Sequence, residues 1–271
     1  MKLMLKHAFA AIVLVLNFAV PVAAGPGEDA MAAFARGDYT TALRLLRPLA
    51  DQGDAQAQYN LGVLYDNGQG VPQDDAEAMK WYRKAADQGD DRGQNNLATM
   101  YSKGQGVPQN DTEAMKWYRK AADQGNARAQ HNLGFMYANG QGAPQNYTEA
   151  MKWYRKAADQ GAAPAQYTLG LFYRRGTGVP QDDAEAVNWY RKAAAQGYSD
   201  AQFNLGIMYQ NGLGIPQDYV QAHMWFNLAA MTGDQGAAEN RNIVAGLMTP
   251  AQIAEAQKLA REWKPTKQAP R

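Results

Sequence analysis

Residues 81–89 read Trp-Tyr-Arg-Lys-Ala-Ala-Asp-Gln-Gly, and near-copies of this stretch recur along the chain at a constant spacing. The tryptophans that open the copies stand 36 residues apart, at Trp81, Trp117, Trp153, Trp189 and Trp225. This spacing accommodates two helices of about four turns each with their connections, the size of an antiparallel helical hairpin. Such a period predicts a solenoid in which one short unit is stacked on the next.

We therefore expect an all-α fold, a right-handed α-solenoid of stacked antiparallel helix hairpins with about 14 helices, in which each unit contacts only its neighbours. The chain would begin with a signal peptide at 1–24 and a degenerate N-terminal hairpin at 25–53. A C-terminal capping helix pair at 234–264 and a disordered tail at 265–271 would end it. Five complete repeats lie between them, at residues 54–89, 90–125, 126–161, 162–197 and 198–233.

Helix-end signals recur in the same phase in every unit. Asp74, followed by Glu77, has the form of a capping box at the start of a second helix, in which each residue bonds the other's backbone N–H. Equivalent pairs occur at Asn110/Glu113, Asn146/Glu149, Asp182/Glu185 and Asp218/Gln221. Gly68 and its equivalents are expected to end the first helices in the left-handed conformation.

The second helix of the first complete unit carries one apolar stripe and one charged face. Trp81 and Tyr82 belong to the stripe, whereas Arg83 and Lys84 lie outside it. Asp87 follows these cations within one turn, so we expect weak, solvated ion pairs among them.

The first 24 residues differ in composition from the rest. Lys2 and Lys6 precede an apolar run of 13 residues, and small residues end the segment at Ala24. A spanning helix needs about 20 apolar residues, so a cleaved signal peptide is favoured over a membrane anchor. We expect a periplasmic or secreted protein without stable membrane insertion.

Charge and composition exclude several classes of function. The chain has 27 basic and 26 acidic residues, and Lys2 and Lys6 would leave with the signal peptide. A net charge near zero argues against nucleic acid as a partner. Cysteine is absent, and the few histidines have no metal-ligand spacing. We therefore expect no metal and no cofactor.

The segment from Ala57 to Gly89 resembles the Sel-one-like repeat (SLR) family, which is related to the tetratricopeptide repeat. The shared pattern reads A-x-x-x-L-G-x-x-Y-x-x-G-x-G-V-P-Q-D-x-x-x-A-x-x-W-Y-x-K-A-A-x-Q-G, and it extends with small departures from Asp54 to about Gly233. The resemblance implies an α-solenoid, and for exported bacterial relatives it implies adaptors or regulators in envelope signalling or assembly.

Residues for catalysis are scarce. The chain contains two serines, Ser102 and Ser199, and neither has lysine at the third following position. Some cysteine-rich relatives in the family have been described as β-lactamases, but their cysteines and a substitute nucleophile are both missing here. We expect a protein that is not an enzyme, with no catalytic residues.

Positions that vary between units are candidates for ligand contact, because stacking requires the same residue at equivalent positions and ligand binding does not. Two such columns lie four residues apart on the first helix of each unit and therefore share a face. The resemblance to tetratricopeptide repeats implies that these positions line a concave, peptide-holding groove, although any apolar member could equally be packing. The predicted partner-binding residues are Tyr59, Val63, Asn95, Thr99, His131, Phe135, Tyr167, Leu171, Phe203 and Ile207, with Lys103 and Arg174 at the rim.

The leading hypothesis is an exported, non-enzymatic scaffold that binds a peptide or protein partner in this groove. One alternative is an envelope glycan-binding protein that uses tyrosines such as Tyr59 and Tyr167 as stacking platforms. A less favoured alternative is a β-lactamase-like or cell-wall hydrolase. The partner's identity and the oligomeric state do not follow from the sequence.

Overall fold

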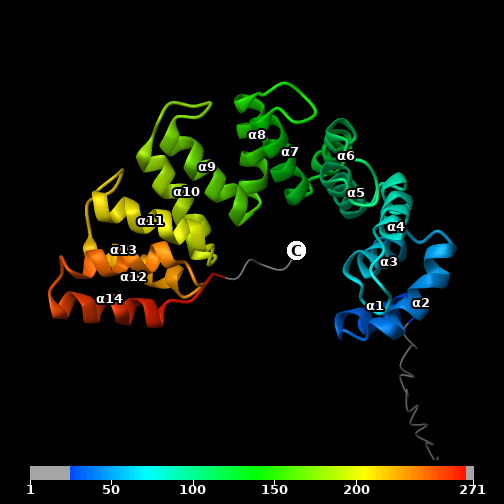
Figure 1. Cartoon of the computed structure of the whole chain (residues 1–271), viewed down its shortest axis with the longest axis horizontal. Helices are drawn as coiled ribbons and strands as arrows, with labels where there is room; N and C mark the ends of the chain where they lie inside the picture. Colours follow the sequence, from blue (N-terminus) through cyan, green and yellow to red (C-terminus); the bar gives the residue numbers. More distant parts are fainter. Residues whose placement is uncertain (1–24, 267–271) are drawn as a thin grey trace, which may run out of the picture.

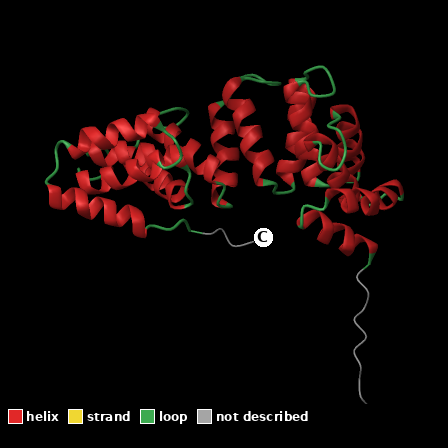
Figure 2. Cartoon of the chain, turned by 60° about the horizontal axis from the view of Figure 1, so that its bottom comes forward, coloured by secondary structure: helices red, strands yellow, loops and turns green. Residues whose placement is uncertain are grey.

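The computed structural model describes residues 25–266, and every regular element in this part of the chain is an α-helix. Figure 2 shows helices joined by loops, with no strand in the coloured part of the chain. The predicted all-α repeat fold is therefore confirmed. The predicted signal peptide at 1–24 and residues 267–271 of the predicted tail lie outside the described residues.

The described residues form fourteen helices, of which α1 to α12 pair in chain order as antiparallel hairpins that follow one another along an arc, whereas α13 and α14 both pack on α12 (Figure 1). On the α1 to α6 side of the picture, the first helix of each hairpin lies on the inner side of the arc. We call the surface formed by the first helices the inner face. The helices are α1 (Pro26–Ala35), α2 (Tyr39–Asp51), α3 (Ala55–Asn67), α4 (Asp75–Asp87), α5 (Asp91–Lys103), α6 (Asp111–Asp123), α7 (Ala127–Asn139), α8 (Tyr147–Asp159), α9 (Ala163–Arg175), α10 (Asp183–Ala195), α11 (Ser199–Asn211), α12 (Tyr219–Ala230), α13 (Gln235–Ala245) and α14 (Pro250–Glu262).

Most helix ends follow the sequence signals, with one correction. Asp74 and its four equivalents each accept a hydrogen bond at the start of the second helix, and Gly68 ends α3 with φ of 64°. The reciprocal half of the predicted capping box is absent in all five units. Glu77 instead accepts hydrogen bonds from Lys80 Nζ and Trp81 Nε1, at 2.7 and 3.0 Å. Because its carboxylate is bonded to residues of the next turn, Glu77 does not accept a hydrogen bond from the backbone N–H of Asp74.

In four of the five complete hairpins, a glycine of the first helix faces an aromatic ring of the second, and Ala98 takes its place in α5. A Cβ added at Gly62 would lie 2.6 Å from the Tyr82 ring, and Gly206 has the same relation to Phe226 at 2.7 Å. These distances are shorter than van der Waals contact, so the two helices approach as closely as glycine permits.

A second glycine column sets the contact between units. Gly142, in the loop between α7 and α8, has φ of 73°, and a Cβ there would lie 2.5 Å from the carbonyl oxygen of Asp111 at the start of α6. Gly106 stands in the same relation to Asp75 at 2.7 Å. The loop of each hairpin therefore rests on the second helix of the preceding hairpin, and its backbone must come close.

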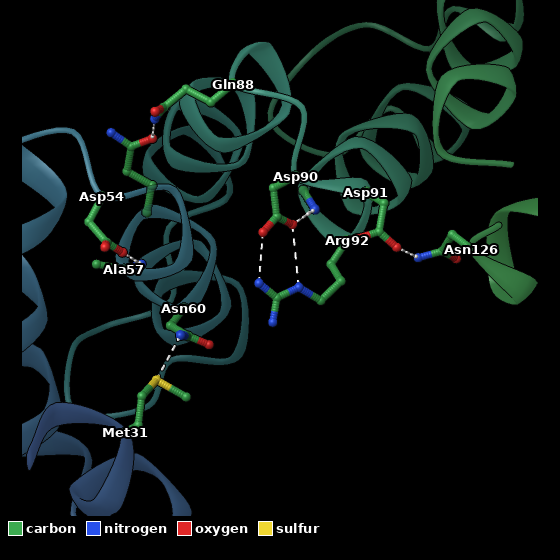
Figure 3. Close-up of polar contacts among 11 residues, drawn as sticks. Met31, Asp54, Ala57, Asn60, Gln88, Asp90, Asp91, Arg92 and Asn126 are labelled. Atoms are coloured by element: carbon green, nitrogen blue, oxygen red, sulfur yellow. Dashed lines mark hydrogen bonds and ion pairs between the residues drawn. The ribbon is translucent and has the colours of Figure 1, made fainter. Parts of the chain in front are cut away.

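Buried glutamines join each unit to the one before it. Gln94 Nε2 donates to the carbonyl oxygen of Ala86 at 3.2 Å, and Gln124 Nε2 donates to Gln94 Oε1 at 2.8 Å. The bond between these glutamines lies within one unit, as where Gln88 Nε2, just after α4, donates to Gln58 Oε1 of α3 at 2.7 Å (Figure 3). The pattern recurs at every joint up to the one between α10 and α11. It gives each of these helix-end carbonyl groups a second donor beside the backbone N–H of the glycine three residues later.

The recurring basic pair also has a structural role, which corrects the ion pairs expected with Asp87. Arg83 Nη2 donates to the hydroxyl of Tyr101 in the next unit, and Lys84 Nζ lies 4.0 Å from the centre of the Trp81 ring. A guanidinium hydrogen bond and a cation–π contact thus replace weak surface ion pairs. The arginine–tyrosine pair recurs at Arg47–Tyr65, Arg119–Tyr137, Arg155–Tyr173 and Arg191–Tyr209.

The C-terminal end is covered by α14. This helix packs on α12, where Ala260 is buried with Leu228, and Trp263 contacts Trp225 edge to face at 6.3 Å. The backbone N–H of Thr266, assigned from the sequence to a disordered tail, donates to the carbonyl oxygen of Ala195 at 2.8 Å. The ordered cap therefore extends two residues past Lys264.

A candidate binding groove on the inner face

The predicted partner-binding residues all lie on the first helices of the five complete hairpins, α3, α5, α7, α9 and α11. Their surroundings differ along the solenoid. The middle members line a common pocket, whereas those at either side have their side chains engaged within the protein. The two columns therefore divide into three local environments.

The structure brings four predicted residues together between α7 and α9. His131 and Phe135 of α7, with Tyr167 and Leu171 of α9, line one pocket of about 490 Å³. Phe135 is 50% exposed, although a side chain of this kind is usually buried. A solvent-exposed aromatic ring beside a pocket of this size is typical of a recognition surface.

Aromatic residues that the sequence analysis did not single out form the wall of the pocket. Phe172 packs edge to face on Tyr154 and on Tyr147, with ring centres 5.5 and 6.1 Å apart. The ring of His131 lies 5.4 Å from that of Tyr154. Tyr154 belongs to the repeated apolar stripe of the second helix. Because the same tyrosine occurs in most units, the sequence gives no sign that this one also lines a pocket. Phe172 and Tyr147 differ from unit to unit and could have been found by comparing the copies.

A second pocket, of about 560 Å³, adjoins the first and shares His131 and Pro164 with it. Its lining comes from the first half of α7, the start of α9 and the residues just after α8 and α10, and it includes Arg128, Asn132 and Ala163. The two pockets form one groove that follows the joint between the third and fourth complete hairpins. We call this surface the α7/α9 groove.

The groove is apolar at its centre and basic at its ends. Burial lowers the pKa of His131, so its imidazole is neutral at pH 7. Arg175 lines one pocket and Arg128 the other, and no carboxylate side chain lines either of them. This distribution suits a segment with a large apolar side chain flanked by acceptors or negative charges.

The N-terminal members of the predicted set already have partners within the protein. Tyr59 packs on Tyr82 with the Arg92 guanidinium 4.4 Å from its ring centre, and Asp90 holds that guanidinium at 2.7 Å (Figure 3). Val63 packs against the core. The Tyr59 ring and the Val63 side chain are therefore partly covered by neighbouring residues of the protein.

Asn95 and Thr99 on α5 are engaged more completely. Asn95 is 6% exposed, and its amide oxygen accepts from Asn132 Nδ2 at 3.4 Å. The Thr99 hydroxyl lies 2.9 Å from that of Tyr118 and donates to the Asn95 carbonyl oxygen at 3.0 Å. Their part in partner binding stays a prediction.

The C-terminal members and the rim residues divide similarly. Phe203 and Ile207 pack against the core of the last hairpin, with Phe203 beside Phe226 at 5.8 Å. Arg174 Nη1 donates to Asn204 Oδ1 of the next unit at 3.2 Å, whereas Lys103 is exposed. Of the predicted set, only the α7 and α9 columns line a shared pocket.

The described residues contain no group of three or more histidine, cysteine, aspartate or glutamate side chains placed to hold a metal ion. In the same part of the chain, no helix has the length and hydropathy needed to cross a membrane. The two serines lie apart, and Ser199 is bonded to Thr232 Oγ1 at 2.8 Å.

Comparison with known proteins identifies the repeat. Six stretches match the model of the Sel1 repeat, at residues 33–54, 55–90, 91–126, 127–161, 163–198 and 199–234. The chain is similar to a Sel1 repeat protein of known structure from Oxalobacter formigenes, with 34% identity over 91% of this chain and 100% of that one, and a TM-score of 0.74. It is similar in fold to the immunity protein Pa5087 from Pseudomonas aeruginosa, with 21% identity over 75% of this chain and 81% of that one, and a TM-score of 0.51. No curated protein matches the chain.

Proposed function

Because the chain belongs to the Sel1 repeat family, whose members are generally non-catalytic scaffolds for protein interaction, we propose that it captures a protein or peptide partner in the α7/α9 groove. The observation that carries this proposal is the exposed Phe135 beside a pocket lined by His131, Tyr167 and Leu171. Rigid aromatic anchors of this kind supply much of the energy of protein interfaces.

The partner would insert an apolar side chain between Phe135 and Leu171 and place an acceptor near Arg175. Both helices are held by neighbours on either side, so the groove is preformed and little ordering is needed on binding. A short helix or an extended peptide would fit a groove of this kind.

The site of action is the second part of the proposal. The basic start, the apolar run and the small residues before Gly25 support export, and we propose action in a bacterial periplasm, in envelope signalling or assembly. The mass of the protein recovered from an osmotic-shock fraction tests this, with a chain starting at Gly25 expected. Recovery of the uncleaved chain in the cytoplasmic fraction would contradict it.

The groove is tested by placing a photo-crosslinking amino acid at Phe135 in cells that produce the protein. We expect a defined adduct whose yield falls about tenfold or more when Tyr167→Ala is added, as for the loss of an interface anchor. The matched control carries the crosslinker at Ile243, an apolar residue of α13 that is 59% exposed and lies outside the groove. Identical adducts from both positions, or none from position 135, would count against the groove.

A further inference from the structure

The joint after the fifth complete hairpin departs from the repeat. At the five preceding joints an arginine of the second helix donates to a tyrosine hydroxyl 18 residues later in the next unit. The equivalent positions at this joint are Asn227 and Ala245. A short amide and a methyl group thus stand where a guanidinium and a phenol stand elsewhere, which leaves space between α12 and α13.

That space forms part of a pocket of about 480 Å³ built by the last three helices. No carboxylate lines it. Its lining consists of His223, Asn227, Arg241, Asn242, Ala245, Ile253, Gln257 and Arg261. Two arginines, three amides and an imidazole make this a pocket of hydrogen-bond donors with net positive charge.

His223 is a second departure from the repeat. The equivalent positions in the other complete units carry Met79, Met115, Met151 and Val187. The His223 side chain is 3% exposed, and its Nδ1 has no hydrogen-bond partner among the described residues. A buried imidazole nitrogen without a partner is costly compared with methionine, so packing does not account for the substitution.

Arg241 is held in position by amides and not by a carboxylate. Its Nη1 donates to Asn227 Oδ1 at 3.2 Å, and its Nε and Nη2 donate to Asn242 Oδ1 at 3.3 and 3.2 Å. Each terminal nitrogen keeps one N–H without a protein acceptor. Arg261 forms no ion pair with any residue from 25 to 266, so both positive charges lack a counterion within the described protein.

We propose that this pocket binds an oxyanion, a carboxylate or phosphate group, between Arg241 and Arg261 beside the imidazole of His223. The fixed guanidinium of Arg241 matches the geometry of such a group, and Gln257 and Asn227 supply neutral polar contacts. The site lies on α12 to α14, away from the α7/α9 groove, and does not depend on it. It is specific to this joint because the other joints are filled by the arginine–tyrosine pair.

The test follows the imidazole proton resonances of the purified full chain by NMR. His223 is assigned with His223→Met, and His131 serves as the internal reference. Inorganic phosphate is titrated at constant ionic strength, and we expect a saturable shift of the His223 resonance with none at His131. Acetate and a tripeptide with a free or amidated C-terminus form separate arms, which distinguish phosphate, a simple carboxylate and a chain terminus as the source.

Variants separate a specific site from general charge attraction. Arg241→Gln or Arg261→Gln should weaken binding about tenfold or more, the effect of losing one charge-assisted hydrogen bond. Lys258→Gln, on α14 outside the pocket, removes the same charge and should change affinity less than about twofold. The double variant Asn227→Arg with Ala245→Tyr restores the repeat's own pair, and it should abolish binding while leaving the chain folded.

The proposal is overturned if no anion gives a saturable His223 shift. It is equally overturned if Lys258→Gln weakens binding as much as Arg261→Gln. Because Arg261 is exposed, its variant is expected to fold, and circular dichroism checks this before the titration.

Discussion

At the scale of single residues, the repeated positions have two kinds of function. Trp153 and Leu133 fill the core, whereas Gln130 and Arg155 join units through hydrogen bonds. The glutamines carry polar groups into a buried joint, and such groups are stabilising only when each has a partner. This explains why the same polar residues return in every unit as regularly as the tryptophans.

Replacing Gln130 by Met should destabilise the joint between the second and third complete hairpins. The change removes the bonds to the Ala122 carbonyl oxygen and from Gln160 Nε2, at 3.1 and 2.7 Å. The Ala122 carbonyl oxygen keeps its bond from the Gly125 backbone N–H, so the cost is that of two lost hydrogen bonds, about 1–3 kcal/mol, and the melting temperature should fall by several degrees. Gln109→Met, in an exposed loop, is the control, and an equal loss in both variants would contradict the role of the joint.

Acid should weaken the fold through two histidines. Burial lowers the pKa of His131 and His223, and the charge of Arg241 lowers that of His223 further. Below the ordinary histidine pKa the unfolded chain binds more protons than the folded one, so stability is complete above about pH 7 and falls as the pH drops through 6.5. Melting temperatures between pH 7.5 and 5.5 should fall less for His223→Met than for the unmodified chain. Equal slopes in the two proteins would contradict this.

At the scale of elements, the hairpin and its loop are held by different glycines. Those of the first helix, such as Gly170 beside Tyr190, set the distance between the two helices of a unit. Those of the loop, such as Gly142 and Gly214, have positive φ and lie against the preceding unit. In the first helix, a side chain at these positions would overlap the facing aromatic ring. In the loop, a side chain would overlap the backbone of the preceding unit and would also have to adopt a positive φ.

Gly142→Ala should destabilise the protein more than Gly125→Ala. Both glycines have positive φ, of 73° and 95°, where a non-glycine residue costs about 1–2 kcal/mol. A Cβ at Gly125 would meet nothing within 4 Å, whereas one at Gly142 would overlap the Asp111 carbonyl, which adds about 1–3 kcal/mol. Chemical denaturation measures both variants. Equal losses would show that the loop can move away from α6.

At the scale of the whole molecule, helix packing connects consecutive hairpins, and the last helix closes the stack, with Thr266 beyond it bonded back to Ala195 of α10. Unit stabilities and joint energies therefore add along the chain, as in other repeat proteins. The two ends differ in composition from the middle: Leu45 stands where the repeat has tryptophan, and Asn227 and Ala245 replace the arginine–tyrosine pair. The terminal unit is thereby free to carry a different site.

A chain shortened after Met248 loses α14 and exposes Met224 and Leu228, which are 7% and 6% exposed in the intact protein. Hydrogen exchange should show lost protection in α11 to α13 and little change in α3 to α6, because the damage passes only through successive joints. A chain ending at Thr266 is the control. Uniform loss along the solenoid would indicate one cooperative unit.

Periodicity by itself determined the all-α repeat fold, the hairpin size and the glycine helix ends, because each depends on local rules that one unit of sequence already contains. The two columns of variable positions also followed from sequence, since a change at a fixed phase is visible without coordinates. Tertiary structure decided which of these positions line a pocket. Asn95 and Phe135 belong to the same pair of columns. The amide of Asn95 is buried and hydrogen-bonded to Asn132, whereas the side chain of Phe135 is half exposed. Burial depends on what the neighbouring unit places opposite, and that is a property of the stacked helices.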